Sequence, residues 1–249
     1  SWEDYVKKTC ETETDNCKNN AGYKDLFKNG TLPRNRLKQF LSFSDMKIIL
    51  ENINDGDNQI QHSFEEKEKT VLIISRFVDF EKNISAALRV WKIVETKSNM
   101  EWKLVLGGYG PDKEMYLKMV QQLGLKNFQY VGPVTDPQEF YAKSSLFLFT
   151  SKIEGFGLTL TEAMQYGTVP VAFNSYSSIR DIIDNDINGC LANSGDECEL
   201  ADKLLDLMYD KEKRIRLARN AMSKIADFSV DVIGPKWLSV IETVLGNNK

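Results

Sequence analysis

Short apolar runs alternate with longer stretches of helical periodicity from Thr70 onward. Runs rich in Val, Ile, Leu and Phe predict strands at 71–75, 103–106, 128–131, 146–150 and 169–173. Apolar residues at helical spacing predict helices at 84–97, 113–123, 137–143 and 159–166, then 179–184, a strand at 190–192, and helices at 197–209 and 211–226. Buried parallel strands are apolar throughout, and helical crossovers connect them. The pattern therefore predicts a Rossmann-like α/β fold with a doubly wound parallel sheet.

The first 60 residues have a different pattern. They are polar, rich in Lys and Asn, and contain one short apolar run at 46–50 that predicts a strand. The polar run 51–68 is typical of a linker, with a turn at 55–58. We therefore expect a domain boundary near residue 60, with the sheet domain at 61–249.

Composition excludes several function classes. The chain has 249 residues, of which 42% are hydrophobic and 27% charged, as in soluble globular proteins. A net charge of -4 argues against a broad basic face and hence against nucleic acid as a partner. No apolar run approaches the roughly 20 residues that span a bilayer. Membrane association is therefore expected only as peripheral attachment, through parts of the protein outside this chain.

The cysteines and the single histidine predict no metal site. Cys10, Cys17, Cys190 and Cys198 lack zinc-ligand spacing, and His62 is the only histidine. We interpret the cysteines as free thiols in a reducing cytoplasm.

Two cations flank the end of the first predicted strand. Arg76 follows this strand, and Lys82 opens the helix after it. Ligands of doubly wound sheets bind at the carboxyl ends of the strands. A guanidinium and an ammonium beside a helix N-terminus suit a diphosphate. The alternative is a pair of solvated surface charges.

Glycine-containing loops follow the second and third predicted strands. Gly108, in the run Leu106-Gly107-Gly108-Tyr109-Gly110, permits close approach of a ligand to the backbone. Asp112 is predicted to cap the next helix. The exposed backbone near Val131 and Pro133 can bond a nucleobase edge. A tight turn explains either loop equally well.

The loop after the fourth predicted strand places two carboxylates around a glycine-rich turn. Glu154 and Glu162 are eight residues apart, with Gly155, Phe156 and Gly157 after the first of them. Such a turn can direct several N–H groups toward one anion while the acids bind hydroxyl groups. The alternative for Glu162 is a capping box with Thr159 as N-cap.

In this order, the loops resemble the donor-binding domain of the family 4 retaining glycosyltransferases, which have the GT-B fold. The resemblance covers about residues 46–228 and rests on Ser75-Arg76-Phe77, Lys82-Asn83, Leu106–Pro111, Tyr130–Val134, Glu154–Gly157, Glu162-Ala163-Met164, Gly167, Pro170, Ile182-Ile183-Asp184 and Asn188–Leu191. The chain departs from the family pattern at Ser145, Thr161 and Asp181, none of which is a proposed ligand.

The resemblance implies a role for each of these loops. Arg76 and Lys82 would hold the diphosphate of a nucleotide-sugar donor, Glu162 would bind the ribose, and Glu154 would face the transferred sugar. The catalytic residues would be Glu154, Arg76 and Lys82. The donor contacts would also include Gly108, Val131, Pro133, Gly155, Phe156, Gly157, Leu158 and Thr159.

The implied reaction moves a hexosyl group from a UDP- or GDP-sugar to an acceptor hydroxyl with retention of configuration. The leaving diphosphate would help to deprotonate the acceptor, and no metal or cofactor is required. The acceptor, a carbohydrate or lipid-linked molecule of polysaccharide or glycolipid synthesis, would bind mainly to an N-terminal domain. Residues 1–60 are too few for that domain and would be its remnant, so we expect a part of a longer protein that binds donor but transfers sugar poorly.

Two further parts of the chain are compared with the family pattern. His62 lies in the linker and cannot take the role of the catalytic histidine in the family's N-terminal domain. Residues 228–247 with Trp237 resemble the family's terminal crossover helix. The alternatives are a nucleotide-sugar epimerase-like enzyme of the same fold and a non-enzymatic nucleotide-binding module.

Overall fold

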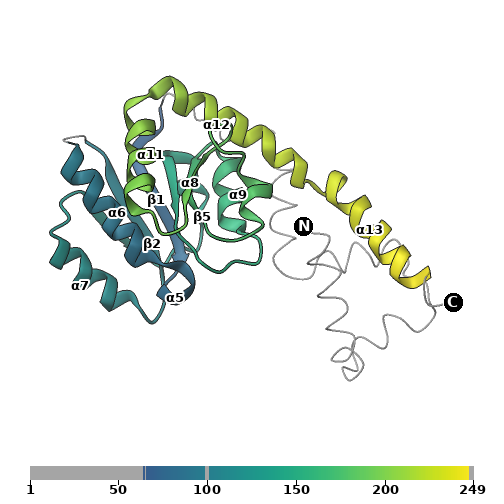
Figure 1. Cartoon of the computed structure of the whole chain (residues 1–249), viewed down its shortest axis with the longest axis horizontal. Helices are drawn as coiled ribbons and strands as arrows, with labels where there is room; N and C mark the ends of the chain where they lie inside the picture. Colours follow the sequence, from purple (N-terminus) through teal and green to yellow (C-terminus); the bar gives the residue numbers. More distant parts are fainter. Residues whose placement is uncertain (1–63, 65, 99–100, 247–249) are drawn as a thin grey trace. The chain divides into compact units, whose positions relative to one another are not determined.

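A six-stranded parallel sheet is the centre of the protein, as the computed structural model in Figure 1 shows. The structure describes residues 64, 66–98 and 101–246. Residues 58–226 form one compact unit, and residues 227–249 do not belong to it. The expected strand at 46–50, the turn at 55–58, His62, Cys10 and Cys17 lie outside the described residues, and the boundary near residue 60 stays a prediction.

The strands follow the predicted apolar runs. They are β1 (Glu68–Arg76), β2 (Lys103–Tyr109), β3 (Phe128–Gly132), β4 (Ser144–Phe149), β5 (Val169–Asn174) and β6 (Cys190–Asn193). Every neighbouring pair is parallel, and the spatial order is β3-β2-β1-β4-β5-β6. This confirms the doubly wound α/β prediction.

Most of the helices also lie where periodicity predicts them. They are α6 (Ile84–Lys97), α7 (Lys113–Leu123), α8 (Gln138–Lys143), α9 (Leu158–Gln165), α10 (Ile179–Ile182), α11 (Glu197–Tyr209) and α12 (Lys211–Ile225), followed by the 3-10 turn Ala226–Phe228. A separate helix, α13 (Val230–Gly246), contains Pro235. In the described part of the chain no helix is both long and apolar enough to cross a membrane.

One helix boundary was predicted wrongly. Lys82 does not open the helix after β1, because a single-turn helix, α5 (Asp79–Lys82), comes first. Asn83 lies between the two helices in the left-handed region, with φ of 52°, which Asn tolerates better than most residues. The Asp79 carboxylate accepts hydrogen bonds from the backbone N–H and the hydroxyl of Ser85, at 2.8 and 2.6 Å. These bonds hold α5 against the start of α6.

The two faces of the sheet are covered by different helices (Figure 1). On one face, alternate strand residues such as Val71, Leu104 and Leu146 form one apolar core with α6 and α11. On the other face, the ring of Phe147 packs edge-on against Tyr141 of α8, at 5.8 Å between centroids. Both faces are therefore dry, and the carboxyl ends of the strands are the natural place for a ligand.

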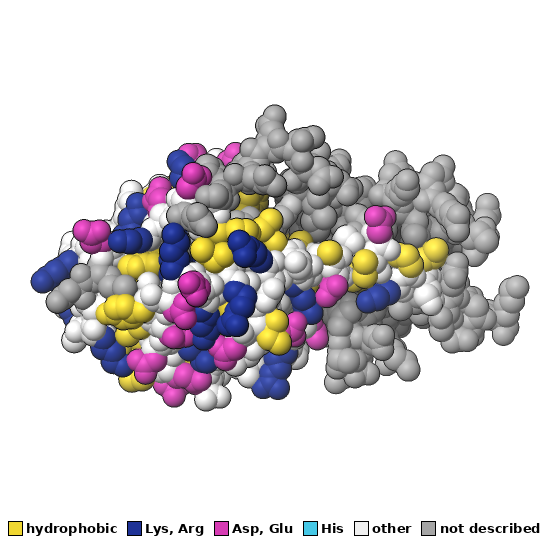
Figure 2. Space-filling view, turned by 90° about the horizontal axis from the view of Figure 1, so that it is seen from above, with side chains coloured by type: hydrophobic (Ala, Val, Ile, Leu, Met, Phe, Trp, Pro, Cys, Tyr) yellow, Lys and Arg dark blue, Asp and Glu magenta, His cyan; other side chains and the backbone are white. Residues whose placement is uncertain are grey.

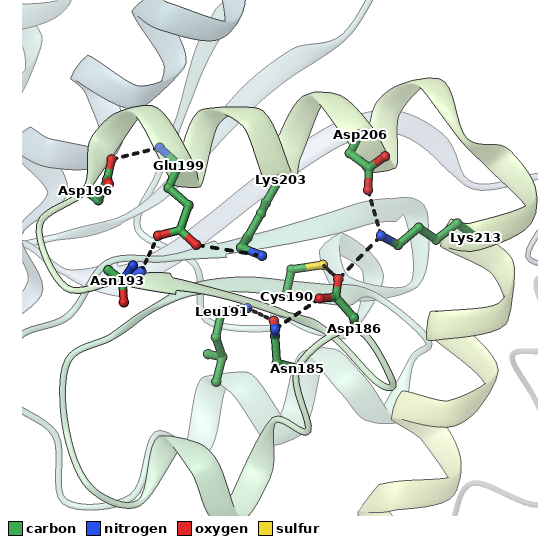
Figure 3. A network of polar contacts seen from close by, with 10 residues as sticks. All are labelled: Asn185, Asp186, Cys190, Leu191, Asn193, Asp196, Glu199, Lys203, Asp206 and Lys213. Atoms are coloured by element: carbon green, nitrogen blue, oxygen red, sulfur yellow. Dashed lines mark hydrogen bonds and ion pairs between the residues drawn. The ribbon is translucent and has the colours of Figure 1, made fainter.

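The described surface mixes charges of both signs. On the face in Figure 2, Lys and Arg side chains lie among Asp and Glu side chains. Figure 3 shows one such cluster near β6, in which Lys213 Nζ lies 2.7 Å from Asp206 and 3.4 Å from Asp186. Burial, with the Asp186 charge, raises the pKa of the nearby Cys190 thiol to about 12. Cys190 and the exposed Cys198 are free, as expected.

Lys67 connects segments at the amino ends of the strands, away from the carboxyl ends where ligands of such sheets bind. Its ammonium donates to the carbonyl oxygens of Tyr141, Ala142 and Ser144 at 2.8–3.0 Å, and to the Thr168 hydroxyl at 3.2 Å. These acceptors belong to the end of α8, the start of β4 and the turn before β5, so one side chain fixes three segments. Burial lowers the pKa of Lys67 to about 7.

The Lys67→Met variant should lose a pH dependence of stability. The folded protein releases the Lys67 proton near pH 7, whereas the unfolded chain keeps it up to about pH 10.4. Wild-type stability should therefore rise with pH across this window relative to the variant, by up to about 1.4 kcal/mol for each pH unit. Urea unfolding of both proteins at about pH 6.5 and 8.5 measures this change. An identical difference at both pH values would contradict the assignment.

Candidate active site

The fold brings the loops after β1 and β4 together at the carboxyl edge of the sheet. These strands are neighbours, and the chain leaves them in opposite directions, toward β2 and toward β5. The backbone N–H groups of Lys152 and Ile153 donate to the Glu81 carbonyl oxygen, at 2.7 and 3.3 Å. The α5 turn and the loop that carries Glu154 are therefore one connected structure, at the switch point where doubly wound sheets bind ligands.

Lys82 and Glu154 form an ion pair at this switch point. Lys82 Nζ lies 2.7 Å from Glu154 Oε1, and their side chains are only 16% and 15% exposed. The Thr150 hydroxyl donates to the carbonyl oxygens of Lys82 and Asn83, which fixes the backbone beside the pair. Burying two charges costs hydration that their attraction only partly returns, so this pair is weak evidence for a purely stabilising role.

Arg76 has a carboxylate partner too, but a far more exposed one. Its guanidinium contacts Glu81 at 2.5 Å, with the two side chains 59% and 32% exposed. Exposed ion pairs contribute little free energy. The Arg76–Glu81 pair is therefore weak, and little free energy is needed to separate it.

The glycine-rich turn opens α9, and the capping-box alternative is wrong. Gly157, not Thr159, is the N-cap of α9, and no side chain caps this end of the helix. Gly157 has φ of 99°, a conformation that favours glycine. Backbone N–H groups at a helix start suit an anion. This end of α9 thus presents Leu158 and Thr159 beside Gly155 and Phe156.

Glu162 lies one turn into α9 and is directed at another helix. The hydroxyl of Tyr141, on α8, donates to Glu162 Oε2 at 3.0 Å. Burial raises the pKa of Glu162, and the bond from Tyr141 partly offsets this effect. The carboxylate is half-buried and bonded to α8, so its expected contact with a ribose stays a prediction.

Gly108, the last residue but one of β2, and Gly110, just after the strand, have a structural explanation. A Cβ atom at Gly108 would lie 1.9 Å from the Ser75 carbonyl oxygen, and one at Gly110 would lie 2.4 Å from that of Phe77. Both glycines thus allow the β1 and β2 loops to pack backbone to backbone. Asp112 does not cap α7 with its side chain, because its carboxylate accepts from the Asp79 N–H at 2.7 Å instead.

The loop after β3 reaches the same edge of the sheet. Val131 is half-buried and Pro133 is exposed. A Cβ atom at Gly107 would lie 3.3 Å from a methyl group of Val131, in β3, and 2.6 Å from a methyl group of Val134, in the loop, so this loop lies against β2. Val131 and Pro133, the expected base contacts, therefore lie at the same edge of the sheet as Arg76 and Lys82.

Two of the three residues that depart from the family pattern make hydrogen bonds within the fold, and the third is exposed. Ser145 donates to the Glu68 carbonyl oxygen at 2.7 Å, and Thr161 donates to that of Leu158 at 2.8 Å. Asp181 is exposed on α10. The sequence pattern did not predict contacts for Glu81 or Tyr141. The loop after β5 was also missed, although it follows a parallel strand, where ligands of such sheets bind.

Comparison with known proteins identifies a family. Residues 55–224 match the family described as "Glycosyl transferases group 1". A Campylobacter jejuni enzyme named for α-1,4-N-acetyl-D-galactosaminyl transfer to an undecaprenol-linked acceptor is 28% identical over 199 residues, which are 80% of this chain and 55% of that protein. The chain spans about half the length of the first curated relatives it matches.

Solved structures support the same fold. A Staphylococcus aureus TarM variant, crystallised with fondaparinux, α-GlcNAc-glycerol and UDP, superposes with a TM-score of 0.68 at 30% identity, over 74% of this chain and 38% of that one. The C-terminal domain of the group 1 protein LpcC from Francisella tularensis gives a TM-score of 0.58 at 24% identity, covering 70% of this chain and 94% of that domain. The fold is therefore that of one GT-B domain.

Glu81→Gln should strengthen UDP binding. The substitution removes the carboxylate that competes for Arg76, and an exposed pair of this kind predicts a gain of about two- to fivefold. Calorimetric titration with UDP measures the change. Glu139→Gln is the matched control, because Glu139 pairs with Lys143 on the exposed surface of α8. Equal UDP affinity in both variants would show that Glu81 does not compete.

Proposed function

The chain belongs to the glycosyl transferases of group 1, and on that premise we propose that it is the donor-binding part of a retaining hexosyltransferase. The donor would be a nucleotide-diphosphate sugar. The observation that carries this proposal is the buried Lys82–Glu154 pair at the switch point of the sheet, with Arg76 at the end of β1, six residues before Lys82.

The charges of the site fit a leaving diphosphate. Arg76 can bind phosphate oxygens bidentately, and Lys82 supplies a compact positive charge. Both would stabilise the negative charge that develops as the glycosidic bond to the diphosphate breaks. The start of α9, with Gly157, Leu158 and Thr159, would add backbone N–H groups to the same anion.

Glu154 would act on the sugar side of the same bond. When the diphosphate takes its place on Lys82, the carboxylate becomes available for sugar hydroxyl groups and for the positive charge that develops at the anomeric carbon. The acceptor oxygen would attack the anomeric carbon from the face that the diphosphate leaves, which retains the configuration, and the leaving diphosphate would receive the acceptor proton. Donor binding and the release of Glu154 would thus be one event.

The relatives suggest the class of donor and acceptor. The TarM structure contains UDP, and the Campylobacter jejuni enzyme is named for transfer of an N-acetylhexosamine to an undecaprenol-linked acceptor. We therefore favour a UDP-hexose or UDP-N-acetylhexosamine donor and a carbohydrate or lipid-linked acceptor of surface polysaccharide or glycolipid synthesis. The acceptor would bind to a part of the whole protein that this chain does not include, and peripheral contact of that protein with a membrane would bring the two together.

Arg76→Ala and Lys82→Gln together should weaken UDP binding by about 30-fold or more, because two charge-assisted contacts are lost. Glutamine at position 82 can still donate to Glu154, which limits the destabilisation that a buried, unpaired carboxylate would cause. Calorimetric titration with UDP, GDP and ADP measures affinity and identifies the base. Lys118→Ala with Arg216→Ala is the charge-matched control, since both side chains are exposed on other helices.

The whole protein carries the test of catalysis. Glu154→Gln should bind UDP at least as tightly as the wild type, because no carboxylate competes for Lys82, but should lose most of the release of UDP from a UDP-sugar in the presence of acceptor. Transfer that survives in this variant would count against a catalytic role for Glu154. No transfer by the wild-type protein would favour the non-enzymatic alternative, and a sugar product with altered configuration at a ring carbon would favour the epimerase alternative. Unchanged UDP binding in the folded Arg76 and Lys82 variant would refute the proposed donor site.

A further inference from the structure

The loop that follows β5 is bonded along the loop that carries Glu154. Three of its hydroxyl groups donate to backbone carbonyl oxygens: Ser175 to Ser151 at 2.5 Å, Tyr176 to Phe156 at 3.3 Å and Ser178 to Gly155 at 3.3 Å. We call Ser175, Tyr176 and Ser178 the hydroxyl clamp. None of the three belongs to the donor contacts proposed above.

Tyr176 is the most constrained member of the hydroxyl clamp. Its ring lies 6.2 Å from that of Phe149, the last residue of β4. A Cβ atom at Gly157 would lie 2.5 Å from the Tyr176 hydroxyl oxygen, so the Tyr176 side chain fits only because residue 157 is glycine. Burial, together with the charge of Glu154, raises the pKa of Tyr176, so the hydroxyl keeps its proton and remains a donor.

Because the peptide bond is planar, a hydrogen bond that fixes a carbonyl group also fixes the direction of the N–H group that follows it. In a trans peptide the carbonyl oxygen and the following N–H point in opposite directions, and the described residues contain no cis peptide. The Ser151–Lys152 unit illustrates the result: its carbonyl accepts from Ser175, and its N–H donates to the Glu81 carbonyl oxygen on the β1 side.

The next two clamped peptide units, Gly155–Phe156 and Phe156–Gly157, are also planar and trans. With the carbonyl groups of Gly155 and Phe156 held by Ser178 and Tyr176, the N–H groups of Phe156 and Gly157 must point away from the β5 loop. The side opposite the β5 loop is the side of β1, where Arg76 and Lys82 lie, because β1 and β5 flank β4. The clamp therefore turns both N–H groups toward the β1 side of this loop, which is the side of the proposed diphosphate site.

We propose that Tyr176 and Ser178 are positioning residues that hold the Gly155–Gly157 backbone in its phosphate-binding orientation. This inference rests on the proposed function and adds a determinant of diphosphate affinity to it. The hydroxyl groups act through the backbone, so they should affect the phosphate part of a nucleotide and not its base.

The Tyr176→Phe/Ser178→Ala variant separates positioning from mere stability. Phenylalanine keeps the ring contact with Phe149 and removes only the hydroxyl. Titration with UDP and with uridine, which lacks phosphate, should give a UDP affinity reduced by about three- to tenfold and an unchanged uridine affinity. Ser223→Ala is the matched control, because its hydroxyl donates to the Arg219 carbonyl oxygen on α12. A parallel loss of both affinities, or no loss, would overturn the inference.

Amide hydrogen exchange of residues 151–157 without nucleotide gives a second readout. The amides of this segment should exchange faster in the Tyr176→Phe/Ser178→Ala variant than in the wild type and the Ser223→Ala control, because the hydrogen bonds to two carbonyl groups are lost. Unchanged exchange would overturn the inference even if the chain does not bind UDP. Failure of the wild type to bind UDP, with faster exchange in the variant, would instead count against the proposed function alone.

Discussion

The Lys82–Glu154 ion pair is the interaction on which the rest of the site depends. Two side chains, each about 15% exposed, give up most of their hydration to meet at the end of β1 and β4. Desolvating two charges costs free energy that their attraction only partly returns. Such a pair therefore adds little to stability. We propose that it serves ligand exchange: a diphosphate that replaced the carboxylate would keep Lys82 neutralised and would release Glu154.

The strand order explains why these two residues meet. Glu154 lies 72 residues after Lys82, and only the adjacency of β1 and β4 brings their loops together. Around this pair, each loop is fixed by a neighbour: the β1 loop by Gly108 and Gly110 at the end of β2, and the β4 loop by the hydroxyl clamp after β5. The site is thus preorganised by backbone contacts, while the charged side chains remain free to change partner.

Local pattern predicted most of the elements but not the breaks between them. The apolar runs and helical periodicity gave the strands and α6, α7, α11 and α12 within a few residues, because burial on one or both faces leaves a regular imprint. Asn83 was missed, since an αL residue has no periodicity of its own. The ion pair of Glu81 with Arg76 and the close approach of Gly108 to the Ser75 carbonyl oxygen exist only in three dimensions, so the sequence pattern does not reveal them.

A crystal structure of this chain with UDP tests the account most directly, because it locates the diphosphate and both carboxylates at once. The account predicts phosphate oxygens within hydrogen-bond distance of Lys82 Nζ, the Arg76 guanidinium and the backbone at the start of α9, with Glu154 no longer on Lys82. A diphosphate bound away from the β1–β4 edge, with the Lys82–Glu154 pair intact at 2.7 Å, would contradict it.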